Sequence, residues 1–309
     1  MTGPDAGLGF VGLGNLGRHL AASLLGRGFT LTVHDLDPGA AEPLVTAGAA
    51  WADSPREVGS AAETVFTCLP SPGAVAGVVA GEHGLLAGMR RGGTWIDTST
   101  TDPHEVQRLA GLAAEAGVRC LEAPVTGGVH LAAAGRLTVL VGGDEDVFEA
   151  NRGALEAIGE RIFHVGPLGS ASVLKVITNM LAFAHVAALG EALMLARRAG
   201  IDLAQAYEVI RASSGNSFVH ETESQVILNG SYDIGFTLDL ACKDLGLASE
   251  LGRTYGVPLE LEGLVERTFA RARERYGGSA WSPTVVKLLE DALGTDLRAP
   301  GFPATISAP

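Results

Sequence analysis

Basic residues and cysteines are scarce in this chain of 309 residues. Its formal net charge is −13 at pH 7, only three of its 22 basic residues are lysines, and Lys and Arg form no basic run. Nucleic acids and anionic membranes bind basic surfaces, so this composition argues against both as partners. The three cysteines, Cys68, Cys120 and Cys242, stand in apolar contexts without the spacing of metal ligands. They predict reduced thiols, no metal site and a cytoplasmic protein.

The sequence also lacks the signals of secretion and of a membrane span. Residues 1–7 do not have the basic start of a signal peptide, and the longest apolar stretch, within residues 166–198, is interrupted by Asn179, His185 and Glu191. We therefore expect no membrane-spanning segment. With 47% hydrophobic and 18% charged residues, the chain can bury a large core, and its length favours two domains over one.

What is present begins with a glycine-rich turn between a strand and a helix. The stretch from residue 8, LGFVGLGNLGRHLAASLLGRGFTLTVHDLDP, reads as strand, turn, amphipathic helix and second strand. Gly12, Gly14 and Gly17, with Asn15 and Leu16 between them, form the GxGxxG pattern that places a dinucleotide pyrophosphate at a helix N-terminus. A chain with 42 glycines produces this spacing by accident, so the strand and helix around it carry the interpretation.

Asp35 ends the second strand, 18 residues after Gly17. A carboxylate at this place accepts hydrogen bonds from the ribose hydroxyls of NAD. The alternative is that Asp35 caps a helix starting near Pro38. We favour the cofactor role, and NAD over NADP, because Leu36 and Asp37 follow instead of an arginine that could pair with a 2′-phosphate.

Strands and helices continue to alternate up to about residue 165, which predicts a doubly wound α/β sheet. In such sheets, ligands bind beyond the carboxyl ends of the strands. The residues at those ends are Leu69, Pro70, Ser99, Thr100, Thr126, Gly127 and Gly128. We expect the first four near the cofactor. The last three offer a hydroxyl and backbone N–H groups to a substrate carboxylate, although an ordinary Gly-Gly turn is the alternative.

Residues 166–198 predict a long helix that carries Lys175 and Asn179 on one face, because the two are four residues apart. This chain uses arginine far more often than lysine, so a lysine indicates a role that arginine cannot fill. Because an arginine stays protonated, Lys175 indicates proton transfer. A lysine with its ordinary pKa near 10.4 is neutral in about one molecule in 2,000 at pH 7, so a role as base requires a lowered pKa. The alternative is a lysine at a helix start that reaches solvent.

The remaining sequence has helical patterns up to about residue 295. A polar bend is expected around residues 213–224, where His220 is either a general base or, as is commoner for a lone histidine, a solvated surface group. The Pro-, Gly- and Ala-rich end predicts disorder. The predicted domains are therefore a dinucleotide-binding domain (1–165), a helical domain for substrate binding and oligomerisation (166–295) and a disordered tail (296–309).

Several motifs together resemble the β-hydroxyacid dehydrogenase family, which includes 3-hydroxyisobutyrate dehydrogenase and tartronate semialdehyde reductase and is related to 6-phosphogluconate dehydrogenase. They are FVGLGNLGRHLAASLL, DTST from Asp97, EAPVTGG from Glu122, GPLGSASVLKVITN from Gly166 and FTLDLACKDLGLA from Phe236. The resemblance covers nearly the whole chain. It implies an N-terminal Rossmann domain, a long interdomain helix, an all-α C-terminal domain, and homodimers or homotetramers.

The resemblance also implies roles for single residues. It implies that Lys175 is the catalytic residue and that Lys243 closes over the cofactor. The implied substrate-binding residues are Asn179, Thr126, Gly127 and Gly128. Four positions depart from the usual family pattern: Thr126 replaces serine, Glu122 aspartate, Thr178 asparagine and Ala171 glycine. None of the four removes the lysine chemistry, but together they weaken an assignment to 3-hydroxyisobutyrate itself.

We therefore expect hydride transfer between NAD and the hydroxyl-bearing carbon of a small 3-hydroxy acid, or the reverse reaction on a semialdehyde, with Lys175 as general acid and base. An imine reductase is one alternative, but that class shares the architecture without usually keeping a lysine at the Lys175 position. A non-catalytic dinucleotide-binding scaffold is the other. Lys175 and Asn179 together argue against it.

Overall fold

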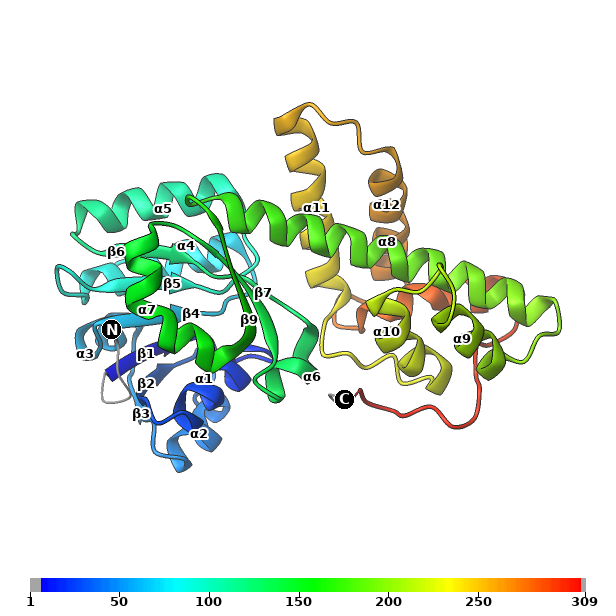
Figure 1. Cartoon of the computed structure of the whole chain (residues 1–309), viewed down its shortest axis with the longest axis horizontal. Coiled ribbons are helices and arrows are strands. Elements are labelled where there is room, and N and C mark those ends of the chain that lie inside the picture. The colour runs from blue at the N-terminus through cyan, green and yellow to red at the C-terminus, as the bar shows by residue number, and fades with distance from the viewer. Residues whose placement is uncertain (1–6, 307–309) are drawn as a thin grey trace. The chain divides into compact units, whose positions relative to one another are not determined.

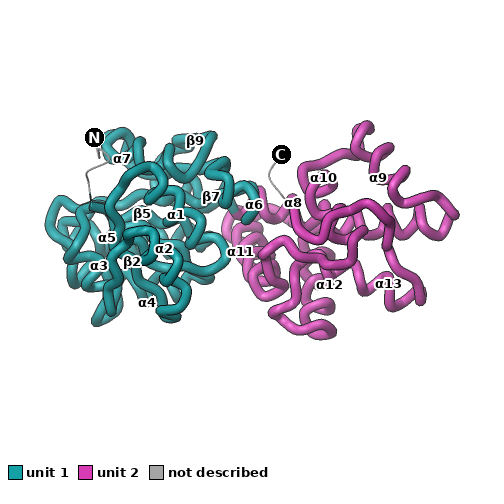
Figure 2. Tube along the Cα trace, turned by 90° about the horizontal axis from the view of Figure 1, so that it is seen from below, with its two compact units in different colours: residues 1–175 teal, residues 176–309 magenta. Residues whose placement is uncertain are grey.

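The computed structural model describes residues 7–306. The chain divides into two compact units, and the boundary between them falls inside a helix, between Lys175 and Val176 (Figure 2). This is ten residues later than the boundary expected from the sequence, because the first turns of the long helix belong to the first unit.

The first unit is built on one mixed sheet, as the alternating pattern predicts (Figure 1). The strand order is β3-β2-β1-β4-β5-β6-β8-β7, with β9 beside β8. Neighbours from β3 to β6 pair in parallel, whereas β8 is antiparallel to β6 and β7 and parallel to β9. The strands are β1 (Gly7–Val11), β2 (Thr30–His34), β3 (Ala50–Trp51), β4 (Thr64–Thr67), β5 (Thr94–Asp97), β6 (Arg119–Glu122), β7 (Val125–Thr126), β8 (Leu137–Gly142) and β9 (Gly159–Gly166).

Helices connect these strands, and their starts follow ordinary capping rules. The helices are α1 (Gly17–Gly26), α2 (Glu42–Thr46), α3 (Pro55–Ala61), α4 (Pro72–Ala80), α5 (Pro103–Glu115), α6 (Gly128–Ala133) and α7 (Glu145–Ile158), with 3₁₀ turns η1 (Pro38–Ala41) and η2 (Leu85–Ala87). Ser54, Ser71 and Asp102 cap α3, α4 and α5 with side-chain hydrogen bonds, and each is followed by a proline at the start of the helix.

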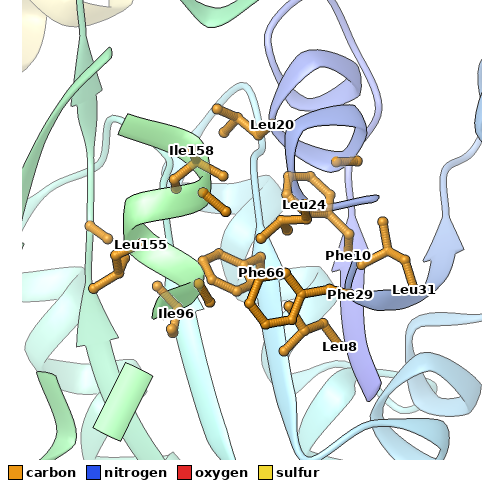
Figure 3. Close-up of a cluster of buried hydrophobic side chains, with 14 of the residues drawn as sticks. Leu8, Phe10, Leu20, Leu24, Phe29, Leu31, Phe66, Ile96, Leu155 and Ile158 are labelled. Carbon is orange, nitrogen blue, oxygen red and sulfur yellow. The ribbon is translucent and has the colours of Figure 1, made fainter. Parts of the chain in front are cut away.

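The sheet has an apolar core on each face. On one face Phe10 and Phe66 stack with their ring centroids 6.1 Å apart, against Leu24 of α1 and Ile158 of α7 (Figure 3). The other face buries Trp95 in a second cluster with residues of α3, α4 and α5. A sheet covered on both faces leaves its strand ends as the place where ligands can approach.

The second unit is helical. It comprises most of α8 (Ser170–Arg198, 29 residues), then α9 (Leu203–Arg211), α10 (Phe218–Asn229), α11 (Leu238–Tyr255), α12 (Glu260–Tyr276), η3 (Ser282–Val286) and α13 (Lys287–Leu293). Val186 and Leu193 of α8 are buried with Leu245 of α11 and Phe269 of α12. Helices α11 and α12 pack against each other (Figure 1).

Helix α8 is also long and apolar enough, by length and composition alone, to cross a membrane. The core helix of a soluble protein passes the same test. Ala171 and Val176 near its start, and Val186 and Leu193 further along, are buried within the protein.

Two expectations about the second unit are wrong. His220 is not a solvated residue in a bend, because α10 begins at Phe218 and the His220 side chain is 1% exposed. One ring nitrogen lies 2.9 Å from the backbone oxygen of Tyr207, and the other lies 2.9 Å from Ser224 Oγ. His220 is therefore a core histidine with both nitrogens satisfied, rather than a base.

The tail expected to be disordered (296–309) is the second correction, because Leu297, Ala299 and Phe302 pack with the core of the helical unit. Leu297 is fully buried, and the Arg298 guanidinium donates to the backbone oxygen of Ile227, to Glu290 Oε1 and to the Tyr232 hydroxyl. The Pro- and Gly-rich composition of the tail predicts disorder only if no tertiary partner is available. Here the helical unit supplies the partners. Residues 307–309 lie outside the described residues.

Candidate active site

The glycine-rich turn between β1 and α1 has the shape that a pyrophosphate requires. Gly12 has φ +99°, and a Cβ there would lie 2.3 Å from the Cys68 backbone oxygen. A Cβ on Gly17 would lie 1.9 Å from the Gly12 backbone oxygen, whereas a Cβ on Gly14 would meet nothing within 4 Å. Helix α1 has no side-chain cap hydrogen bond. The turn thus fits an anion near Gly14 and the start of α1.

Asp35 lies beside this turn, directly after β2. Its Oδ2 accepts a hydrogen bond from the Leu13 N–H at 2.6 Å, and its Oδ1 accepts one from the Asp37 N–H at 2.9 Å. Each carboxylate oxygen keeps further acceptor capacity for a ribose hydroxyl. The helix-cap alternative is wrong for Asp35, because Asp37 makes that bond by accepting from the Gly39 N–H.

The residues after β4 and β5 are joined by hydrogen bonds at the same edge of the sheet. The Leu69 N–H donates to Ser99 Oγ at 2.9 Å, and that hydroxyl donates to Asp97 Oδ1 at 2.6 Å. Pro70 and Thr100 are the next residues along the two segments. The structure therefore brings the predicted cofactor residues of these strands together.

Thr126 and the two glycines after it form the junction between β7 and α6. Gly127 has φ +127° and Gly128 has φ +81°, a backbone region that favours glycine. A Cβ on Gly127 would also lie 2.8 Å from Leu131 Cδ1. His130 follows within the same turn, and burial lowers the pKa of its imidazole. The sequence did not single out His130, because one histidine near a turn carries no signal by itself.

Lys175 is buried in the second turn of α8, with only 8% of its surface exposed. The alternative of a lysine reaching solvent is therefore wrong. Asn179 lies one helical turn further along α8. Buried lysines are rare unless they are paired or functional, so Lys175 stays a candidate for the chemistry of the site.

Asp244 of α11 connects two of the predicted residues and was missed from the sequence. It is fully buried, accepts a hydrogen bond from Asn179 Nδ2 at 2.5 Å, and forms an ion pair with Lys243, whose Nζ lies 2.7 Å from its Oδ1. The sequence pattern could have indicated Asp244, since it lies between Ala241 and Leu245 on the buried stripe of its helix. A carboxylate on an apolar stripe needs a polar partner.

Within residues 7–306, no cluster of three or more His, Cys, Asp or Glu side chains could hold a metal ion. Two surface hollows occur along α11 and α12, one beside Cys242 and one beside Pro258. Neither is lined by a predicted site residue. The chemistry of this protein is thus to be sought at the strand ends and along α8.

Comparison with known families decides the identity of the fold. Residues 7–166 match the sequence model described as the NAD binding domain of 6-phosphogluconate dehydrogenase, and residues 169–289 match the one described as NAD-binding of NADP-dependent 3-hydroxyisobutyrate dehydrogenase. The chain belongs to the β-hydroxyacid dehydrogenase family. It is an oxidoreductase of the hydroxy-acid dehydrogenase class with NAD as its cofactor, which confirms the predictions of fold, family and enzyme class.

Individual β-hydroxyacid dehydrogenases are similar to this chain over most of its length. The 2-(hydroxymethyl)glutarate dehydrogenase of Eubacterium barkeri is 35% identical over 291 residues, which cover 94% of this chain and 97% of that protein. The 3-hydroxyisobutyrate dehydrogenase structure from Salmonella typhimurium superposes with a TM-score of 0.86 at 31% identity and covers 92% of this chain and 100% of that one. An imine reductase from Pseudomonas sp., at 17% identity and TM-score 0.62 over 92% and 99% of the two chains, shares only the fold.

Proposed function

We propose that this protein oxidises the hydroxyl-bearing carbon of a small 3-hydroxy acid, reversibly, with Lys175 as general acid and base. The observation that carries the proposal is a buried lysine one helical turn before Asn179, in a chain with only three lysines. The hydroxy acids named for the relatives, 2-(hydroxymethyl)glutarate and 3-hydroxyisobutyrate, support this substrate class.

NAD, when bound, supplies the acceptor for the hydride that leaves the substrate carbon. In the oxidative direction the neutral amine of Lys175 takes the hydroxyl proton as the alcohol becomes a carbonyl. In the reductive direction the ammonium form returns that proton to the carbonyl oxygen. An arginine could supply charge at this position but could not exchange the proton.

The substrate carboxylate is assigned to Thr126, Gly127 and Gly128. The positive φ angles of the two glycines and the absence of their Cβ atoms support an exposed set of backbone N–H groups beside the Thr126 hydroxyl. Asn179 is assigned to substrate orientation, and its side-chain amide is held by the hydrogen bond that Nδ2 donates to Asp244. Groups that hold the remote end of a substrate lower the barrier by fixing the reacting geometry.

The cofactor residues proposed are Gly12, Gly14, Asn15, Leu16 and Gly17 at the pyrophosphate, Asp35 at the adenosine ribose, and Leu69, Pro70, Ser99, Thr100 and Lys243 along the rest of the cofactor. Lys243 is held by Asp244 at 2.7 Å. A lysine tethered in this way can approach a cofactor phosphate without the full entropic cost of ordering its side chain.

The decisive experiment is a panel of 3-hydroxy acids, with NAD and with NADP, in which formation of the reduced cofactor is followed by absorbance. We expect turnover with one or more 3-hydroxy acids and NAD, and a large loss in the Lys175→Ala variant. Turnover of cyclic imines instead would favour the imine reductase alternative. Cofactor binding without turnover of either substrate class would favour a scaffold.

We also propose a homodimer or homotetramer in the cytoplasm. In the helical unit Ile177 and Leu181 of α8, and Leu261 and Leu264 of α12, are large apolar side chains that are exposed. Contacts with another copy would remove them from water. The three cysteines, which form no disulfide, support a reducing compartment. Light scattering coupled to size-exclusion chromatography measures the molar mass in solution. A monomer at micromolar protein concentration would contradict the proposed oligomer.

A further inference from the structure

Glu122, at the end of β6, contacts the start of the helix that carries Lys175. The Glu122 side chain is 1% exposed. Its Oε1 accepts hydrogen bonds from the Gly169 N–H at 2.7 Å and the Ala171 N–H at 2.9 Å. Its Oε2 accepts from the Ser172 N–H at 3.0 Å and also from the Ser172 hydroxyl. Four donors thus face two carboxylate oxygens.

This cap comes from the sheet and not from the residue before the helix. The first N–H groups of a helix have no intrahelical partner, and a Ser, Thr, Asp or Asn at the N-cap usually accepts from them. Before α8 that place is taken by Gly169, which has no side chain and has φ +100°. Glu122, 47 residues earlier in the sequence, supplies the acceptors instead. The first turn of α8 is therefore fixed to the end of a central strand.

Two glycines make room for the Glu122 carboxylate and for the turn that it holds. Gly142 of β8 pairs with Glu122, and a Cβ there would lie 2.2 Å from Glu122 Oε1. A Cβ on Gly169 would lie 2.8 Å from Gln107 Nε2, whose amide donates to the Leu168 backbone oxygen at 3.1 Å. Gly142 therefore leaves room for the Glu122 carboxylate, and the turn before α8 is held by Gln107.

A second buried carboxyl links the cap to the cofactor edge of the sheet. Asp97 is the register partner of Glu122 in the neighbouring strand, and it accepts hydrogen bonds from Thr67 Oγ1 at 2.7 Å and Ser99 Oγ at 2.6 Å. Burial raises the pKa of Asp97, and the charge of Glu122 raises it further. The two carboxyl groups therefore lie on neighbouring strands, one at the cofactor edge and the other at the start of α8.

We propose that Glu122 is a positioning residue for Lys175, because it fixes the place and the axial rotation of the helical turn from which the Lys175 side chain extends. Lys175 lies three residues after Ser172, so any shift or fraying of the first turn moves its amine. A displacement of about 1 Å in a reacting group can cost ~10²-fold in rate. The inference rests on the proposed acid–base role of Lys175.

The first test is Glu122→Gln. The variant replaces one carboxylate oxygen by an NH₂ group, which cannot accept. At the Oε1 position it loses both bonds to backbone N–H groups, and at the Oε2 position it loses at least the bond from the Ser172 N–H, since the Ser172 hydroxyl can turn to accept. We expect kcat to fall by about tenfold or more, within the range that misplacement produces. The dissociation constant of NADH, measured by fluorescence titration, should change less than about threefold, since the glycine-rich turn is untouched.

The second test combines this variant with Lys175→Ala. If Glu122 acts through Lys175, Glu122→Gln lowers the residual kcat of the Lys175→Ala protein by less than about twofold. An equal loss of kcat in both backgrounds, or a wild-type kcat in Glu122→Gln alone, overturns the inference. A wild-type kcat in Lys175→Ala alone overturns the proposed acid–base role, and the positioning role falls with it. The two failures are therefore distinguishable.

A matched control separates positioning from general loss of stability. Asp202 caps α9 by accepting from the Gln205 N–H at 2.9 Å, and α9 carries no proposed site residue. Asp202→Ala should lower Tm by a few degrees and leave kcat unchanged. If Glu122→Gln does not fold, Ser172→Ala replaces it, since it removes one of the four hydrogen bonds. We then expect kcat about two- to fivefold lower, and only when Lys175 is present. An unchanged kcat in Ser172→Ala would overturn the positioning role.

Discussion

Lys175 is where charge and proton transfer can be separated experimentally. Lys175→Arg keeps the positive charge, but the arginine stays protonated in a protein and cannot act as a base. General acid–base catalysis contributes typically ~10²–10⁴-fold, so we expect kcat on the best acid to fall by at least ~10²-fold with NAD affinity little changed. Steady-state kinetics and a cofactor titration measure both quantities. A Lys175→Arg protein with more than about a tenth of wild-type kcat would show that charge alone was needed.

Asp35 allows the nucleotide preference to be tested. Its carboxylate repels a 2′-phosphate and can accept from a free ribose diol, so NAD should exceed NADP by roughly tenfold in kcat/KM, or ~1.4 kcal/mol. Asp35→Ala should narrow this ratio mainly by weakening NAD, and it also removes the bonds to the Leu13 and Asp37 N–H groups. Asp37→Ala is the control, because it removes only the cap of η1. A clear NADP preference in the wild type would contradict this assignment.

At the scale of single elements, α10 carries Glu223, a half-buried residue with a buried carboxyl oxygen that makes stability depend on pH. Glu223 Oε2 is buried without a hydrogen-bond partner in the described structure, and burial raises the pKa of Glu223 to about 8. The folded protein therefore holds this proton more tightly than the unfolded chain. The stability that this group contributes is fully present below about pH 4.5 and is lost as the pH rises through about 8.

Glu223→Gln should accordingly raise Tm by a few degrees near pH 8 and change it little near pH 4.5, because glutamine needs no deprotonation. Glu221→Gln is the matched control on the same helix, since Glu221 is exposed and hydrogen-bonded to Asn216. Thermal unfolding of the three proteins at both pH values measures the effect. Parallel Tm curves for wild type and Glu223→Gln would argue against a buried ionisation at this site.

At the scale of the whole molecule, the C-terminal tail is a structural part of the helical unit. Arg298→Ala removes hydrogen bonds to Ile227, Tyr232 and the buried Glu290, which we expect to cost about 1–3 kcal/mol in the free energy of unfolding. Arg197→Ala breaks an exposed ion pair with Asp296 and should cost about 0–1 kcal/mol. Denaturant unfolding compares the two variants. Equal midpoints would mean that the tail adds little to stability.

Short contiguous patterns made much of this architecture and part of the site predictable. The glycine-rich turn, the strand and helix rhythm, and the Lys175–Asn179 spacing are local, because a helical or strand period places neighbouring residues on known faces. The nucleotide assignment depends on Asp35, whose position after a strand follows from the same local pattern. These features require no knowledge of distant partners.

Tertiary structure alone decided the contacts between distant residues. Glu122 meets α8 47 residues later, Asp244 meets Asn179 across 65 residues, and Arg298 meets Tyr232 across 66. The buried His220 ring has a hydrogen-bond partner at each nitrogen, the Tyr207 backbone oxygen at one and the Ser224 hydroxyl at the other. A polar side chain is buried only where folding supplies its hydrogen-bond partner, and the identity of that partner depends on how the chain packs rather than on local sequence.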